Sequence, residues 1–127
     1  MIKDFLILYC IGKNDKIGLK IYNSFYIHEL SQTINNSDML VSNILDLLKK
    51  HKAIINNDFS ILVNYGPGSF SSIRTSLVAV KGIKISRKIN VFGFKNQDLG
   101  QFTLANIELL IERKLIEKNL IKPIYLS

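Results

Sequence analysis

The chain has 127 residues, of which 47% are hydrophobic and 21% charged, a composition that excludes disorder as the dominant state. This length is enough for one domain with a single core, and we expect one domain over residues 1–127. The single cysteine, Cys10, excludes an internal disulfide, and no cysteine and histidine cluster predicts a metal site. A reducing compartment, the cytoplasm, is therefore the expected location.

The charge balance is basic, with 17 Lys and Arg residues against 10 Asp and Glu, which gives a formal net charge of +7. Such an excess suits a nucleic-acid partner. The basic residues are mostly lysines, however, and they are scattered along the sequence rather than clustered. We therefore expect any contact with nucleic acid to be indirect or weak.

The longest apolar run, residues 5–11, has seven residues, whereas a membrane-spanning helix needs about 20. We expect no membrane segment. The run predicts a strand that is covered on both faces. A turn at residues 12–16 follows, then an alternating strand at 17–22 and a third strand at 25–28. These three strands predict an antiparallel meander.

Residues 39–51 form the first predicted helix, with Ser37 as its N-terminal cap. Its apolar positions cover a wider arc than one sheet face requires. The central stripe and its two flanking positions are Leu40, Ile44, Leu47 and Leu48, with Val41 and Leu45. Such a helix is either enclosed within its own domain or offers a second face to a partner chain.

The remaining elements alternate between strand and helix: a strand at 59–63, a helix at 73–88, a strand at 89–94 and a helix at 98–118. The complete order is strand, strand, strand, helix, strand, helix, strand, helix. This order predicts an α/β fold, with helices packed on a mixed sheet.

One glycine-rich segment lies between a predicted buried strand and a helix. It is Gly66-Pro67-Gly68-Ser69-Phe70, hereafter the motif turn. A turn in this position could hold an anion against the helix dipole, but the Lys and Ser or Thr of a Walker phosphate loop are absent. The same residues also suit a structural turn, with glycines at positive φ and Ser69 capping the helix.

Other residues capable of chemistry have structural explanations. Cys10 lies in the most apolar strand, and His51 falls at a helix C-terminus, where a cation is favourable. No serine, histidine and aspartate combination predicts a hydrolytic site, so we expect no catalytic residue. The enzyme alternative is a small hydrolase or phosphate-binding enzyme that uses the Gly66 to Ser69 turn, with Ser69 or Ser71 as the active group.

Residues 61–74, ILVNYGPGSFSSIR, resemble the G-P-G-S-F-T-G-[IV]-R signature of the TsaB family, also called YeaZ. The opening strands and the segment Pro123-Ile124-Tyr125-Leu126 also resemble that family. The resemblance implies a single lobe of the actin and sugar-kinase superfold, with residues 98–127 as the family's last helix and C-terminal tail. The family's second α/β lobe has no counterpart here, so a shortened form without ATP or another cofactor is expected.

The family's usual Asp-Thr after the first strand is replaced by Tyr9 and Cys10, and its Thr-Gly in the motif by Ser71 and Ser72. What the resemblance implies is a non-catalytic subunit of a tRNA-modifying complex. It would bind a TsaD-like catalytic subunit, together with a TsaE-like ATPase, in the synthesis of threonylcarbamoyladenosine beside the anticodon, and would form a homodimer in isolation.

The family pairs through its first two helices, which correspond here to residues 39–51 and 73–88. The candidate interface residues on these helices are Leu40, Ile44, Leu47, Ile73, Arg74 and Leu77.

Overall fold

The computed structural model describes residues 2–30, 36–87, 89–118 and 125–126. Its main sheet consists of β1 (Asp4–Tyr9), β2 (Lys16–Ile21), β3 (Ser24–Glu29), β4 (Phe59–Asn64) and β6 (Asn90–Phe94). The helices are α1 (Ser37–Lys50), α2 (Phe70–Arg87), α3 (Asn96–Leu99) and α4 (Leu104–Glu112). A two-residue strand, β5 (Gly68–Ser69), pairs in parallel with β7 (Tyr125–Leu126).

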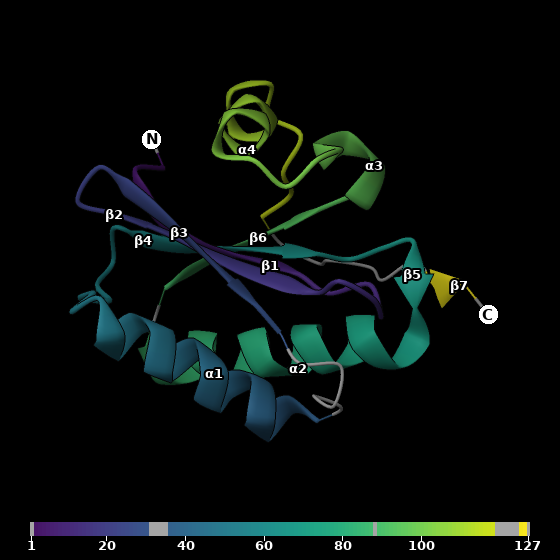
Figure 1. Cartoon of the computed structure of the whole chain (residues 1–127), viewed down its shortest axis with the longest axis horizontal. Coiled ribbons are helices and arrows are strands. Elements are labelled where there is room, and N and C mark those ends of the chain that lie inside the picture. The colour runs from purple at the N-terminus through teal and green to yellow at the C-terminus, as the bar shows by residue number, and fades with distance from the viewer. Residues whose placement is uncertain (1, 31–35, 88, 119–124, 127) are drawn as a thin grey trace.

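The main sheet is mixed and has the strand order β3-β2-β1-β4-β6. The strands β1, β2 and β3 form the predicted antiparallel meander, while β4 lies parallel to both β1 and β6. The two helices α1 and α2 cover one face of this sheet, and α3 and α4 cover the other (Figure 1). The predicted α/β class and mixed sheet are therefore confirmed.

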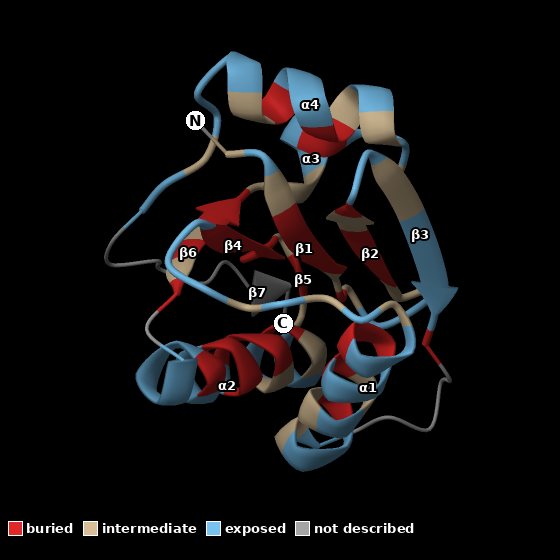
Figure 2. Cartoon of the chain, turned by 90° about the vertical axis from the view of Figure 1, so that its left-hand side faces the viewer, coloured by how far each residue is buried: buried red, intermediate tan, exposed pale blue. Residues whose placement is uncertain are grey.

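The central strand β1 explains the long apolar run at the start of the chain. Its side chains alternate between two cores, so both sets must be apolar. Leu6 and Leu8 pack into the core beneath α1 and α2, whereas Phe5 and Ile7 pack into the smaller core beneath α3 and α4. Figure 2 shows buried residues on the sheet and on the helix surfaces that face it.

The first helix begins at Ser37, but its N-terminal cap is Asn36 rather than the predicted Ser37. The Asn36 side-chain oxygen accepts a hydrogen bond from the Met39 backbone N–H at 2.8 Å. Asn36 has extended backbone angles, as a capping residue does. The prediction was wrong by one position because three polar residues with capping ability, residues 36–38, stand together at this end.

The single helix predicted over residues 98–118 is wrong, because the chain forms two shorter helices there. Gly100 has a φ of 71°, which ends α3, and the Thr103 hydroxyl caps α4 by accepting from the Asn106 N–H at 3.2 Å. Between them Phe102 packs onto the sheet, with its ring centroid 5.9 Å from that of Tyr9 and 6.2 Å from that of Phe25. These aromatic contacts favour the break over a continuous helix.

The second helix starts at Phe70, three residues earlier than predicted, and the predicted final residue of that helix, Lys88, lies outside the described residues. Pro123 and Ile124 of the predicted closing segment also lie outside them. Within the described ranges, no helix combines the length and apolar character needed to cross a bilayer.

Candidate functional site

The candidate site lies at the carboxyl ends of the neighbouring strands β1 and β4, where the chain leaves each strand and enters a turn. The fully buried Asn64 joins these strand ends, because its side-chain oxygen accepts from the Cys10 N–H at 2.8 Å and its amide donates to the Cys10 carbonyl at 3.0 Å. The amide thus replaces the two ladder hydrogen bonds that Cys10 would otherwise make to a neighbouring strand. This bridge fixes the position from which both turns start.

The turn after β1 is held by Asp15, whose carboxylate accepts from the N–H groups of Ile11 at 2.8 Å and Gly12 at 3.0 Å. Gly12 has a φ of 110°, and a Cβ atom at this position would lie 2.9 Å from the Cβ of Ser69. Both observations require glycine. The first turn can therefore lie directly against the motif turn.

The motif turn is fixed from both sides. The Ser69 N–H donates to the Ile11 carbonyl at 3.3 Å, and on the other side Asn96 donates its backbone N–H to the Gly66 carbonyl at 3.0 Å and its side-chain amide to the Pro67 carbonyl. The Gly66-Pro67 peptide bond is cis. As predicted, Gly66 has a positive φ, of 126°, and the Ser69 hydroxyl accepts from the Ser72 N–H, at 3.4 Å.

Gly68 does not have the positive φ that the sequence suggested. The space around it is tight instead, since a Cβ there would lie 3.1 Å from the Cδ1 atom of Ile73. At the start of α2, the Arg74 guanidinium lies 5.9 Å from the centroid of the Phe70 ring. Several groups of the turn are thus engaged with the chain itself, which favours a structural role for this segment.

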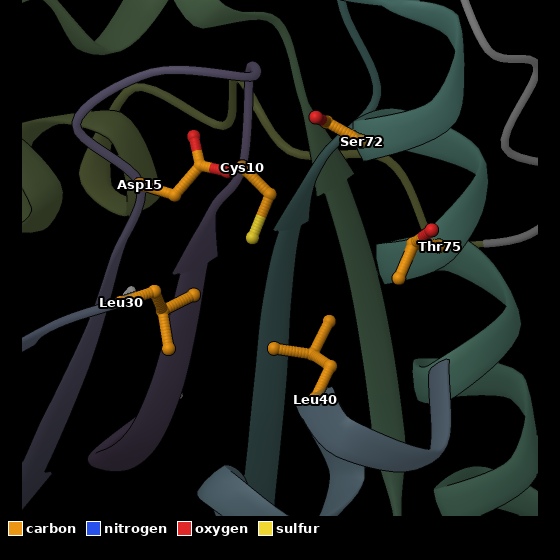
Figure 3. A pocket seen from close by; sticks show the side chains of 6 residues that line it. All are labelled: Cys10, Asp15, Leu30, Leu40, Ser72 and Thr75. Atoms are coloured by element: carbon orange, nitrogen blue, oxygen red, sulfur yellow. The ribbon is translucent and has the colours of Figure 1, made fainter. Parts of the chain in front are cut away.

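A small pocket lies beside the two turns (Figure 3). Its lining side chains come from β1 and its turn, the end of the meander and the two large helices: Cys10, Asp15, Leu30, Leu40, Ser72 and Thr75. The pocket volume of about 20 Å³ is space for one water molecule. A space of this size does not enclose a phosphate group or a peptide.

The side chains that line the pocket are also poorly suited to catalysis. Burial raises the pKa of the Cys10 thiol far above its usual value, and the nearby negative charge of Asp15 raises it further. Cys10 therefore stays protonated and is a poor nucleophile at neutral pH. Within the described ranges, no group of three or more histidine, cysteine, aspartate or glutamate side chains is placed to hold a metal ion.

The predicted interface residues lie in the fold's own core, with one exception. Arg74 is exposed, whereas the five apolar candidates are buried between the sheet and the two large helices: Leu40, Ile44, Leu47, Ile73 and Leu77. These five side chains have almost no surface to offer a partner in this structure. The apolar positions chosen from the sequence mark the inner faces of α1 and α2 rather than an interface. Sequence alone does not separate the two, because core and interface positions follow the same helical period.

Other apolar side chains on these two helices do face outward. Leu45 on α1 is 40% exposed, and on α2 Val78 is 49% and Ile85 is 81% exposed. Gly82 lies on the same outward side of α2, and a Cβ there would meet no atom within 4 Å. Leu45, Val78, Gly82 and Ile85 form the outer helix surface. The sequence signal for this surface was that the apolar positions of α1 cover a wider arc than the core requires. Val41 packs against the core, whereas Leu45 does not.

No family model and no curated protein matches the chain. Among solved structures, YeaZ from Pseudomonas aeruginosa matches with a TM-score of 0.67 and 18% identity, over 88% of this chain and 50% of that one. The chain therefore has the fold of YeaZ. An uncharacterised protein similar to peptidase YeaZ, also from Pseudomonas aeruginosa, matches with a TM-score of 0.66 and 17% identity, over 76% of this chain and 45% of that one. The chain thus spans about half the length of these two proteins.

Proposed function

We propose that this chain is a non-catalytic partner subunit of the TsaB type, which acts in the cytoplasm. It binds and supports a TsaD-like enzyme, alongside a TsaE-like ATPase, in the threonylcarbamoyladenosine modification of tRNA. The observation that carries the proposal is the YeaZ fold, found in a chain whose motif turn also resembles the TsaB signature.

The outer helix surface supports a binding role. Leu45 on α1 and Val78 on α2 are about half exposed, although both are apolar and lie in regular helices that pack against each other. Gly82 is in the interior of α2, where glycine costs about 1 kcal/mol relative to alanine. Packing within the described part of the chain does not require this glycine, since a Cβ there would meet no atom within 4 Å. A helix backbone that must approach a partner closely would explain both features.

The pocket supports a non-catalytic role. Relatives in this superfold use an acidic residue at the end of the first strand, and Tyr9 and Cys10 occupy those positions here. The space beside them takes one water molecule, and the Cys10 thiol is held in its protonated form. The alternative of a hydrolase or phosphate-binding enzyme is less well supported for the same reasons, and it predicts an activity that Ser69→Ala would abolish without unfolding the chain.

The test is the molar mass in solution, by light scattering after gel filtration, of the chain alone and mixed with its cognate TsaD-like enzyme. We expect a homodimer alone and a mixed species near the sum of the two subunit masses. Leu45→Asp should abolish the mixed species because it places a charge in the proposed interface. The matched control is Leu109→Asp, since Leu109 is also 40% exposed but lies on α4, across the sheet.

Two outcomes would contradict the proposal. One is the absence of a complex at micromolar concentrations of both proteins. The other is an equal loss of the complex in Leu45→Asp and Leu109→Asp, which would place the contact elsewhere. Ile44→Asp is unsuitable as a probe, because Ile44 is completely buried and the substitution would unfold the chain.

A further inference from the structure

The two edges of the main sheet differ in how the chain covers them. At one edge lies β6, where Gly93 exchanges two backbone hydrogen bonds with Glu117, at 2.7 and 2.8 Å. At the other edge lies β3, and within the described ranges no segment pairs with its outer side. Figure 2 shows β3 at the border of the molecule, with most of its length exposed. β3 is therefore an open edge strand.

The hairpin of β2 and β3 shows which residues of β3 turn their backbone groups outward. Tyr22 and Asn23 form its two-residue turn, and both have positive φ, as in a type I′ turn. A hydrogen-bonded pair closes such a turn, and here the pair is Ile21 with Ser24. In an antiparallel ladder, every second residue after Ser24 then bonds to β2, and the residues between them face away.

The residues of β3 that face away are Phe25, Ile27 and Glu29. The far end of the hairpin agrees with this alternation, because the Leu30 N–H donates to the Asp15 carbonyl at 2.9 Å. Within the described ranges, the backbone groups of the three outward residues have no hydrogen bond to another segment. These backbone groups, hereafter the open edge, are free to pair with a further strand.

The strand that carries the open edge lacks the common features that protect edge strands. Its six residues, SFYIHE, include no proline and no lysine, and its register with β2 runs without a bulge. Apolar side chains instead stand on both of its faces, since Ile27 is 51% exposed and Tyr26 is 36% exposed. Neither side chain belongs to one of the two cores. The strand is therefore suited to pairing with another strand.

We propose that β3 pairs with β3 of a second copy of this chain, in antiparallel orientation about a two-fold axis at Ile27. This register pairs the three outward residues entirely with one another. Phe25 lies opposite the partner's Glu29, and Ile27 lies opposite the partner's Ile27. Each of these pairs exchanges two backbone hydrogen bonds. The inference goes beyond the proposed function and does not depend on it.

The apolar and aromatic side chains of β3 complement one another in this register. On the sheet face covered by α3 and α4, the two exposed Ile27 side chains meet at the axis. On the other face, Tyr26 lies opposite the partner's His28, and both side chains are exposed in the single chain. Cross-strand pairs of branched and aromatic side chains stabilise antiparallel sheets. A second copy would therefore cover the surface that the chain itself leaves open.

The charges also fit this register. Glu29 is the only formally charged residue of β3, and it lies opposite a phenyl ring rather than opposite its own copy. Lys20 is the β2 neighbour of Phe25, and Lys16 is the β2 neighbour of Glu29. Each carboxylate therefore lies in one row between Lys16 of its own chain and the partner's Lys20. A register centred on Glu29 would instead bring two like charges together, which destabilises a strand pair.

The size of the contact sets its strength. A standard protein interface has about 20 to 30 residues on each side, whereas this one is built mainly from the six residues of β3. The pairing is therefore weak and opens at micromolar concentrations. A complex with the enzyme at those concentrations keeps one copy of this chain. At higher concentrations the open edge supplies the homodimer expected of the isolated chain and leaves the outer helix surface free.

The experiment is sedimentation equilibrium of the isolated chain from about ten micromolar to about one millimolar, which measures the dissociation constant of the dimer. Ile27→Lys should raise this constant at least about tenfold, because it places two like charges directly opposite each other. The matched control is Ile54→Lys, which adds the same charge at an isoleucine that is 73% exposed and lies outside β3. It should change the constant by no more than about twofold.

Three outcomes would overturn the inference. The first is a chain that stays monomeric over the whole concentration range. The second is a dimer that Leu45→Asp weakens and Ile27→Lys does not, because the outer helix surface would then hold the two copies together. The third is a loss of the enzyme complex in Ile27→Lys at micromolar concentrations, because the open edge would then belong to the contact with the enzyme. If the dimer forms as expected but the enzyme never binds, only the proposed function fails.

A cross-linking measurement tests the register directly. Residues opposite each other in a hydrogen-bonded pair have Cα atoms about 5.5 Å apart, which lies within the span of a disulfide. Diamide oxidation should therefore link Ile27→Cys into a covalent dimer on a non-reducing gel. Ile54→Cys is the control and should stay unlinked, and the remaining cysteine, Cys10, is buried. Equal cross-linking of the two variants, or none in Ile27→Cys, would contradict the proposed axis.

Discussion

The phenol of Tyr65 donates a hydrogen bond to the carboxylate of Glu117, with 3.0 Å between the two oxygens. Tyr65 directly follows β4, and Glu117 lies beyond α4, where it exchanges two backbone hydrogen bonds with Gly93 at 2.7 and 2.8 Å. This contact fastens the segment after α4 to the strand that leads into the motif turn. Burial and the Glu117 carboxylate raise the pKa of Tyr65 to about 12.

The first prediction concerns alkaline stability. The folded state keeps Tyr65 neutral more strongly than the unfolded state does, so its contribution to stability is complete below pH 10 and is lost as the pH rises from 10 to 12. The Tyr65→Phe variant removes this hydrogen bond, and we expect it to lower the free energy of unfolding at pH 8 by about 1 kcal/mol. Urea denaturation of both proteins at several pH values measures the difference.

The difference in the free energy of unfolding between the original protein and Tyr65→Phe should narrow as the pH approaches 12, because the Tyr65 phenol then ionises and no longer stabilises the folded state. Tyr22→Phe is the control, because Tyr22 is exposed and its hydroxyl donates to the Lys52 carbonyl far from Glu117. A difference between the original protein and Tyr65→Phe that stays constant from pH 8 to 12 would contradict the proposed cause.

The second prediction concerns the bridge between β1 and β4. Replacement of Asn64 by leucine leaves the N–H and the carbonyl of the buried Cys10 without partners. We expect a loss of about 2 to 4 kcal/mol, since each unpaired buried group costs roughly 1 to 3 kcal/mol. Asn43→Leu is the control, because that amide makes one hydrogen bond on an exposed helix surface. Similar losses in the two variants, measured by urea denaturation, would argue against the bridge.

The sequence predicted the central sheet well because its signals are local and unambiguous. A run of apolar residues with no polar side has to be covered on both faces, as residues 5–8 are in β1. The break at residues 100–103 was missed because a helical period continues through it. Only the three-dimensional contacts of Phe102 with Tyr9 and Phe25 reveal the competing arrangement.

The candidate site was predictable only in part. The conformation of Gly66 and the capping role of Ser69 follow from residue type, but that of Gly68 did not. The bridge from Asn64 to Cys10 joins residues 54 positions apart and has no sequence pattern. The apolar period of α1 could not separate Ile44, which is buried, from Leu45, which faces outward, because both belong to one wide arc.

The third prediction concerns the Cys10 thiol. Because Cys10 is only 4% exposed and its pKa is raised, iodoacetamide should modify it very slowly in the folded protein at pH 8. The rate should rise to that of a free thiol when urea unfolds the chain. Mass spectrometry of the alkylated protein across a urea titration measures this. Rapid alkylation without urea would mean that the pocket beside Asp15 opens readily, and it would support a reactive site at Cys10.

The last prediction separates the stability of the chain from its binding. Gly82 lies in the interior of α2 and faces open space, so Gly82→Ala should raise the free energy of unfolding of the chain by about 1 kcal/mol. If a partner helix packs closely against α2, the added methyl group must at the same time weaken the complex. Ser86→Ala, one turn further along α2, is the comparison. It also increases helix propensity, at a position whose hydroxyl donates to the Gly82 and Ile83 carbonyls of its own helix. Denaturation curves and light scattering with the TsaD-like enzyme measure the two effects. A Gly82→Ala variant that is more stable and binds the enzyme as tightly as before would remove Gly82 from the proposed contact.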